Sequence, residues 1–241
     1  MDSPTLLEHL ATEGARVTAI GTDRLSSEVP SMPGWDLGRL IGHLGVVSHL
    51  AAADAAGAGA ETDRSNLPKA PRDESVVDYY AASLAHATEV LGGLDPEAVC
   101  STWNGPQTVG WWIRRLTHET AMHRWDAENT LGEPVPIDAA LAVDAIDEIF
   151  DLFTGTRFDL DAFGPAGETI HLHATDIDGE WLAAFTTDGV TCERAHARGD
   201  VAVRGPASDL LLAFWSRRAL DGLEVFGDAS LIPRWQAAAS F

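Results

Sequence analysis

The chain has 241 residues, of which 45% are hydrophobic, and it carries a formal net charge of −21 from 37 acidic and 16 basic side chains. This length allows one large domain or two modest ones. Such a negative chain is repelled by nucleic-acid phosphates and by anionic membrane surfaces. Lys69 is the only lysine, and no Lys/Arg cluster offers a nucleic-acid footprint. We therefore expect neither a nucleic acid nor a membrane as a partner.

The start of the chain lacks the basic stretch and apolar run of a signal peptide. No apolar stretch approaches the roughly 20 residues that span a bilayer. Cys100 and Cys192 are the only cysteines, and they form no CxxC pair of the kind used for redox work or metal binding. These features predict a cytoplasmic protein.

The first half of the chain has the apolar spacing of helices. Ser3-Pro4 is a favourable helix start, and Asp36 can cap a second helix after the break at Pro30 to Gly34. Four long helices separated by loops predict an antiparallel bundle. The expected helices lie at about 3–25, 36–56, 74–94 and 108–130, with a fifth at about 137–153.

After about residue 155 the pattern becomes strand-like. Strands are expected at about 169–175, 180–190, 200–204 and 223–226, with helices at about 206–217 and 230–239. The second of these strands ends in the turn signal Thr187-Asp188-Gly189. The predicted fold class is therefore α+β, with a helical bundle at 1–155 and a small α+β domain at 156–241.

The most informative segment runs from Arg115 to Asp126, with the sequence RLTHETAMHRWD. It is not the HExxH zinc motif, because His118 and His123 are five residues apart and lie roughly 140° apart around a helix. Glu119 and His123, at i and i+4, share one face. The apolar stripe of the helix places His123 inside it and Glu119 at its edge, whereas His118 is expected on the opposite, solvent side.

A buried carboxylate needs a partner, because leaving it unpaired costs several kcal/mol or more. A divalent cation would serve for Glu119, and so would Arg39 or Arg115. His43, on the second helix, can supply one further imidazole. Two histidines and one glutamate with an open fourth position form a catalytic zinc ligand set.

Other interpretations remain open from the residues alone. Glu119 and His123 can form a simple intrahelical ion pair, and His43 can be a hydrogen-bonded core residue. His171 and His173 alternate on one face of an expected strand, and with His196 they could form a second metal site. The pattern alone favours that second site less than the first.

Two segments resemble the signatures of a known family. Residues 29–44 (VPSMPGWDLGRLIGHL) and 108–126 (TVGWWIRRLTHETAMHRWD) resemble the second- and fourth-helix signatures of the mycothiol-dependent maleylpyruvate isomerase family. Residues 200–235 look like the small, sterol-carrier-like domain of that family. The resemblance implies a DinB-like four-helix bundle with a zinc-type ion on His43, Glu119 and His123.

The resemblance also implies a reaction. Mycothiol would be the cosubstrate, and its metal-activated thiolate would attack an electrophilic or unsaturated acid, giving cis–trans isomerisation or thiol S-transfer. The family uses an arginine from the small domain, for which Arg217 and Arg218 are the catalytic candidates, with Arg204 behind them. The alternative is that these arginines sit at a solvated helix C-terminus, where basic residues are favoured.

Fold and metal can be inherited from such motifs, whereas the reaction cannot. Two other functions therefore stay open. One is a metal-dependent hydrolase or lyase that activates water instead of a thiol. The other is a non-catalytic protein that binds a lipid or another small molecule in the second domain.

Overall fold

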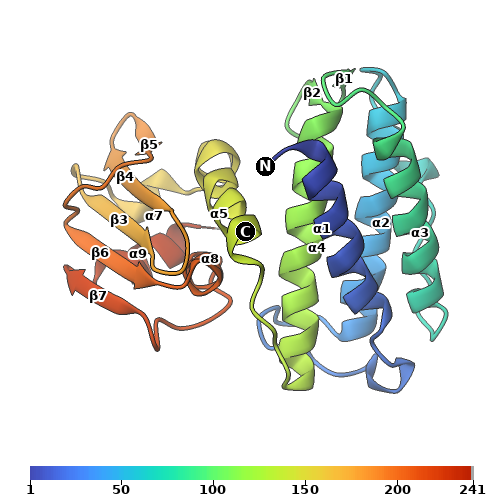
Figure 1. Ribbon diagram of the computed structural model, residues 1–241, viewed down its shortest axis with the longest axis horizontal. Helices are drawn as coiled ribbons and strands as arrows, with labels where there is room; N and C mark the ends of the chain where they lie inside the picture. Colours follow the sequence, from blue (N-terminus) through green and yellow to red (C-terminus); the bar gives the residue numbers. More distant parts are fainter. Residues whose placement is uncertain (240–241) are drawn as a thin grey trace. The chain divides into compact units, whose positions relative to one another are not determined.

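In the computed structural model, residues 1–239 are described, except for the side chains of Phe153 and Thr156. The chain divides into two compact units, Met1–Val135 and Pro136–Phe241. Figure 1 shows helices in the first unit and a sheet with helices in the second. The α+β class predicted from the sequence is confirmed. Among the described residues, no helix is both long enough and apolar enough to cross a membrane.

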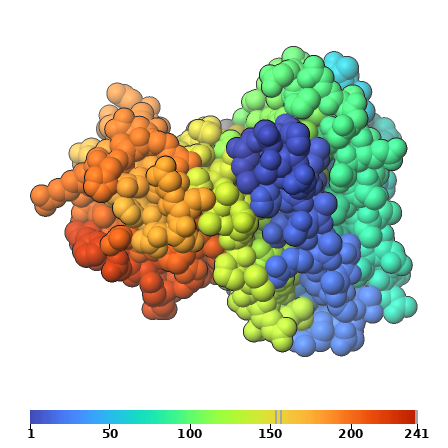
Figure 2. All heavy atoms as spheres, in the orientation of Figure 1, coloured from blue at the N-terminus to red at the C-terminus, as the bar shows by residue number. Residues whose placement is uncertain are grey.

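Within Met1–Val135, four long helices carry most of the structure (Figure 1). Helix α2 packs against α3 and α4, and α1 packs against α4 and α3. Figure 2 shows α1, in blue, on the face of this unit turned toward the viewer. The elements in chain order are α1 (Ser3–Thr18), η1 (Thr22–Arg24), α2 (Leu37–Ala56), η2 (Arg64–Asn66), α3 (Val76–Gly92), β1 (Val99–Cys100), β2 (Gln107–Thr108) and α4 (Val109–Leu131).

Local side-chain caps explain where three of these helices begin. Asp2 accepts a hydrogen bond from the backbone N–H of Thr5, and Asp36 accepts one from Arg39 at 2.7 Å. Thr108 does the same for α4. Such caps satisfy N–H groups that have no partner inside the helix. At its other end, α4 stops at Leu131 and is followed by Gly132, whose φ of 83° favours glycine.

Two details of the first unit differ from the prediction. Helix α1 ends at Thr18, and the rest of the predicted helix is a turn and the short η1. The segment expected to be a turn before α4 contains β1 and β2, which pair antiparallel. Strands of two residues are too short for an alternation of apolar and polar residues to be recognised in the sequence.

The second unit contains a five-stranded mixed sheet with the order β5-β4-β3-β6-β7. Among the described strands of this sheet, β3 and β6 run parallel and are connected through β4 and β5, whereas the other neighbouring pairs are antiparallel. Helix α8 connects β6 to its antiparallel neighbour β7. Helix α8 packs against β3 and β6. The elements are α5 (Ala139–Glu148), η3 (Ile149–Phe153), α6 (Thr154–Thr156), α7 (Leu160–Phe163), β3 (Thr169–Ala174), β4 (Glu180–Thr186), β5 (Gly189–Glu193), β6 (Val201–Gly205), α8 (Ala207–Phe214), β7 (Glu224–Gly227) and α9 (Leu231–Ala238).

The structure splits one predicted strand into two. The chain reverses between Thr186 and Gly189, where Gly189 has a φ of 138°, and β5 then pairs antiparallel with β4. The turn is recognisable in the sequence, but the strand that follows it is not. Its alternation is weak because all five of its residues are at least partly exposed.

The division between the units falls at Val135 and Pro136, whereas the sequence pattern placed it between residues 155 and 156. The physical reason is the packing of α5. This helix contacts α8 of the second unit, although its apolar spacing resembles that of the preceding helices.

Candidate functional site

Glu119 and His123 lie one turn apart on α4, and their side chains meet. His123 Nε2 is 3.2 Å from Glu119 Oε1. The i, i+4 spacing places both side chains on the same face of the helix. His123 is buried, whereas the Glu119 side chain remains 20% exposed. Glu119 and His123 therefore meet on the face of the helix that the sequence pattern predicted.

His43 reaches the same point from α2. Its Nε2 atom lies 2.8 Å from Glu119 Oε1, the oxygen that also faces His123. The rings of His43 and His123 are 5.2 Å apart between centroids. One ligand atom from each of the three residues lies within 4.8 Å of the others. We call His43, Glu119 and His123 the bundle cluster.

The second oxygen of Glu119 is held by Arg115, whose Nη2 atom lies 2.6 Å from Oε2. This buried arginine is one of the two rivals to a cation that the sequence offered. The structure thus contains the ion pair and the three-residue convergence together. Arg115 occupies Oε2, whereas both imidazoles meet at Oε1.

Asp126 orients His123 from behind. Its Oδ2 atom is 2.9 Å from His123 Nδ1, and its Oδ1 atom accepts a hydrogen bond of 2.5 Å from Ser31. Such a carboxylate fixes the ring and leaves the other nitrogen, Nε2, directed at the cluster. Sequence reasoning missed Asp126 in this role. The i, i+3 spacing from His123 was the available signal.

Neighbouring charges set the protonation of the bundle cluster. Burial opposes ionisation of Glu119, but Arg115 and the two histidines hold its pKa well below its usual range. Burial alone would lower the pKa of His123, but hydrogen bonds and charge from Asp126 and Glu119 raise it to about 9. Since histidine binds a metal only as the neutral imidazole, a metal ion and a proton compete for this ring.

The donors of the bundle cluster fit a divalent ion. Two imidazole nitrogens and one carboxylate oxygen converge from two helices, with a second carboxylate behind one ring. This is the donor set of catalytic zinc sites, which leaves one coordination position for water or substrate. His43 also lines a cavity and its side chain is 32% exposed, so the cluster is accessible on the side of His43.

His118 is buried, and the prediction that it faces solvent is wrong. The prediction assumed a helix with one covered face. Helix α4 packs against both α1 and α2, and buried residues lie all around it. Among the described residues, the group that is close enough to hold a metal ion with His43 does not include His118. His118 therefore stays outside the predicted ligand set.

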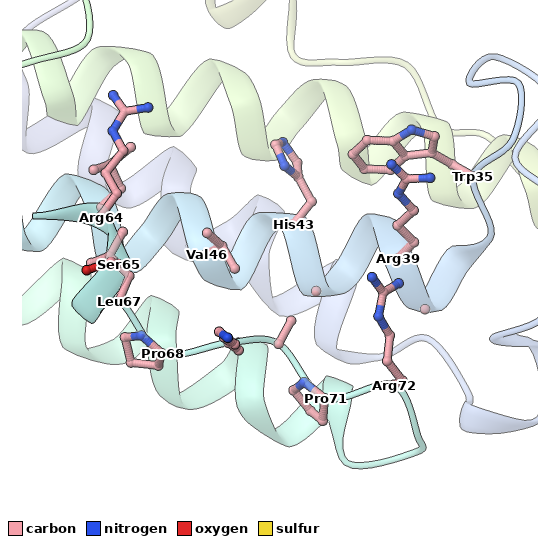
Figure 3. A pocket seen from close by; sticks show the side chains of 15 residues that line it. Trp35, Arg39, His43, Val46, Arg64, Ser65, Leu67, Pro68, Pro71 and Arg72 are labelled. Carbon is pink, nitrogen blue, oxygen red and sulfur yellow. The ribbon is translucent and has the colours of Figure 1, made fainter.

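A cavity of about 620 Å³ opens beside His43 (Figure 3). Figure 3 shows His43 pointing from α2 toward α4, with Arg39 and Arg72 to one side of it and Arg64 to the other. Lys69 also lines the cavity, and the described lining residues include no carboxylate. Four cations thus line one cavity of a chain that has only 16 basic residues.

Sequence reasoning missed this group of cations. Three of them, Arg64, Lys69 and Arg72, lie within nine residues of a segment interpreted only as a loop. Arg39 joins them from α2, where its guanidinium stacks over the ring of Trp35 at 4.4 Å. The close spacing of these three basic residues in the loop was a signal of a binding site. Its interpretation depends on the fold, because the fold brings Arg39 and His43 to the same cavity.

Arg217 and Arg218 lie just after α8 in the second unit, and both are half-buried. Arg218 forms an ion pair with Asp209 and donates a hydrogen bond to the carbonyl of Asp221. Arg217 donates to the carbonyl of Trp215 at 3.2 Å. Their predicted catalytic role stays a prediction.

Neither cysteine is suited to act as a nucleophile. Cys100 is fully buried, and burial together with Asp54 raises the pKa of its thiol. Burial, followed by the charges of Asp147 and Asp151, raises the pKa of Cys192 to about 12. Since the thiolate is the reactive form, the raised pKa values make both thiols poor nucleophiles near neutral pH.

Comparison with known proteins agrees with this architecture. Residues 7–128 match the mycothiol maleylpyruvate isomerase N-terminal domain, and residues 140–234 match the MDMPI C-terminal domain. The chain therefore belongs to the mycothiol-dependent maleylpyruvate isomerase family, which is a family of enzymes. The family predicted from the two helix segments is confirmed.

Two crystal structures share the fold of the chain. They are mycothiol-dependent maleylpyruvate isomerase and a histidine-to-alanine mutant of it, with TM-scores of 0.64 and 0.66. Each match covers 93% of this chain and 93% of the other, at 14% sequence identity. No curated protein sequence matches the chain significantly. The identity is low, so these structures support the fold and leave the substrate open.

Proposed function

We propose that this chain is a metal-dependent enzyme that uses mycothiol for cis–trans isomerisation of the maleylpyruvate type, or for transfer of the thiol sulfur to an electrophilic substrate. One observation carries the proposal. Two imidazoles and one carboxylate converge, and one of the imidazoles, that of His43, lines a cavity that four cations also line. Family membership supplies the thiol and the class of reaction.

His43, Glu119 and His123 would hold the ion, for which zinc is the best candidate. When bound, a zinc-type ion lowers the pKa of a thiol that reaches its open position. Asp126 keeps Nε2 of His123 directed at the cluster, and Arg115 keeps Glu119 ionised in a partly buried position. These residues thus hold three donors ready in a fixed arrangement.

The cavity supports an acid as the substrate. Arg39, Arg64, Lys69 and Arg72 can bind carboxylates, and arginine does so through two parallel hydrogen bonds. In the isomerisation, the thiol sulfur adds to one carbon of the cis double bond, and the electron pair moves to the conjugated carbonyl oxygen. Rotation about the new single bond and loss of the thiol give the trans acid. Nearby cations stabilise the negative charge that develops.

Arg217 and Arg218 remain the candidates for an arginine contributed by the second unit. Because Arg218 pairs with Asp209, its replacement is expected to lower stability as well as activity. The melting temperature of each arginine variant therefore has to be measured beside its turnover. We further propose a cytoplasmic location, because a reduced low-molecular-weight thiol persists in that compartment.

The test is turnover of maleylpyruvate by the untagged full-length protein, followed as conversion of the cis to the trans acid. We expect conversion only with mycothiol, loss of conversion after chelation, and recovery on adding zinc. Equal turnover without any thiol would contradict the thiol-dependent mechanism and favour the hydrolase or lyase alternative. Full turnover by metal-free protein would contradict the metal site.

If maleylpyruvate is not converted, the same samples can be screened with other electrophiles, following loss of free thiol. Consumption of thiol with formation of a stable adduct would identify an S-transferase. No turnover and no thiol consumption with any electrophile would favour a non-catalytic binding protein.

A further inference from the structure

Three histidines and a glutamate meet on the sheet of the second unit. His171 and His173 are two residues apart on β3, so both side chains leave the same face of the strand. Glu180, the first residue of β4, is the direct cross-strand partner of His173. This register brings its carboxylate to both rings, at 3.1 Å from His171 Nε2 and 3.2 Å from His173 Nδ1.

His196 completes the group from the segment between β5 and β6. Its Nδ1 atom lies 2.6 Å from Glu180 Oε2. The three imidazole rings form a nearly equilateral triangle, with centroid separations of 6.1, 6.0 and 6.0 Å. We call His171, His173, Glu180 and His196 the sheet cluster.

The geometry of the sheet cluster is close to that of a coordinated ion. One ligand atom from each residue lies within 4.8 Å of all the others. Donors about 2.0–2.1 Å from a tetrahedral zinc ion are about 3.3 Å from one another. Small movements would therefore close the donors around an ion. His196 can make such a movement, because its side chain is 82% exposed and lies outside the strands.

Hydrogen bonding alone does not account for three histidines around one carboxylate. Glu180 is 23% exposed and can be hydrated, so it does not need three imidazole partners. Arg204, the partner of His173 on β6, brings a positive charge to this region, but it pairs with Glu224 at 3.4 Å. The positive charge of Arg204 is thus already balanced by the carboxylate of Glu224.

We propose that His171, His173, Glu180 and His196 form a second metal site, which takes a divalent transition-metal ion of the zinc type. Three imidazoles and one carboxylate favour zinc, copper or nickel over magnesium or calcium. All four tetrahedral positions come from the protein, as in structural zinc sites. Three donors come from the β3–β4 hairpin and the fourth from the segment after β5, so the ion would fasten residues 194–200 to the sheet.

The first experiment is zinc stoichiometry by elemental analysis after dialysis of the untagged full-length protein against zinc. The variants are His196→Ala, Glu119→Ala and, as a matched control, His86→Ala on the exposed face of α3. We expect two equivalents in the wild type and in the control, and one in His196→Ala. His196 is exposed, so its replacement does not threaten folding.

The variants separate this proposal from the proposed function. Loss of one equivalent in His196→Ala supports the sheet cluster, whatever Glu119→Ala shows. Loss in Glu119→Ala alone supports the bundle cluster. If the wild type and His196→Ala bind the same number of zinc ions with the same affinity, the second site does not exist.

A second experiment tests the fastening of residues 194–200. Trypsin can cleave after Arg194 and Arg198, which flank His196 and are exposed. Zinc should slow cleavage at these two bonds in the wild type and in Glu119→Ala, but not in His196→Ala. Equal cleavage with zinc and with a chelator in the wild type would overturn the fastening role.

Discussion

The bundle cluster and the sheet cluster use the same residue types in two different surroundings. In the bundle cluster, α4 supplies two donors one turn apart and α2 supplies the third, beside a cavity lined with cations. In the sheet cluster, two donors alternate along β3, the third is a cross-strand neighbour, and the fourth comes from an exposed segment. Three donors leave a position open for chemistry, whereas four close the coordination sphere.

The surroundings differ as much as the donor number. Asp126 and Arg115 hold the bundle cluster from behind, and both are buried. The sheet cluster includes His196, which is mostly exposed. Preorganised and partly buried donors suit catalysis, whereas a cluster with one movable member suits a fastening role.

The largest effect is expected from removing a donor of the bundle cluster. His43→Ala, Glu119→Ala and His123→Ala should each lose the ion of this site and at least about 100-fold in turnover, because a Lewis acid contributes several kcal/mol of transition-state stabilisation. Metal content and turnover measure this. His118→Ala should keep the ion. Retention of that ion by both Glu119→Ala and His123→Ala would rule out the site.

A smaller effect is expected behind His123. Asp126→Asn removes the charge that Nδ1 of His123 faces, so the zinc affinity of the bundle cluster should fall about 10–100-fold. Competition with a chromophoric chelator measures the affinity. Asp78→Asn, an exposed site on α3, is the matched control. Unchanged affinity in Asp126→Asn would show that Asp126 does not support the ligand.

The cavity cations are expected to act on binding of the acid. Arg64→Met or Arg72→Met should each raise the KM for a dicarboxylate by about tenfold or more, because a hydrogen bond to a charged group is worth about 1.5–3 kcal/mol. Steady-state kinetics at low and high salt measure this effect. Arg24→Met, exposed outside the cavity lining, should leave KM unchanged. A fall in turnover with an unchanged KM would contradict a substrate-binding role.

The smallest effect is expected from the chain's own thiols. Cys192→Ser should keep turnover within about twofold, because a thiol with a pKa of about 12 is almost fully protonated at pH 8. For the same reason, native Cys192 should resist iodoacetamide at pH 8, as measured by mass spectrometry. Loss of activity in a well-folded Cys192→Ser would mean that the chain supplies its own nucleophile.

Features that depend on nearby residues were predictable from the sequence. Helices α2 and α4 begin where Asp36 and Thr108 can cap them. The i, i+4 pair of Glu119 and His123 and the alternation of His171 and His173 follow from the periods of a helix and a strand. The two helix signatures are also enough to indicate the family, because they preserve residue types at fixed local spacing.

Convergence from distant parts of the chain was decided by tertiary structure. Packing of α2 on α4 brings His43 Nε2 to Oε1 of Glu119, the oxygen that also faces His123. The helical period alone could not decide whether Glu119 belongs to a metal site or to an ion pair with Arg115. Other helices cover α4 on more than one side, so His118 is buried, whereas the sequence pattern predicted that it faces solvent. The periodicity of a sequence indicates which side of a helix or strand is covered. Which residues cover that side depends on the course of the loops and on the register of the strands. Those factors placed Arg64 in the lining of the cavity that His43 also lines, and placed Glu180 2.6 Å from His196.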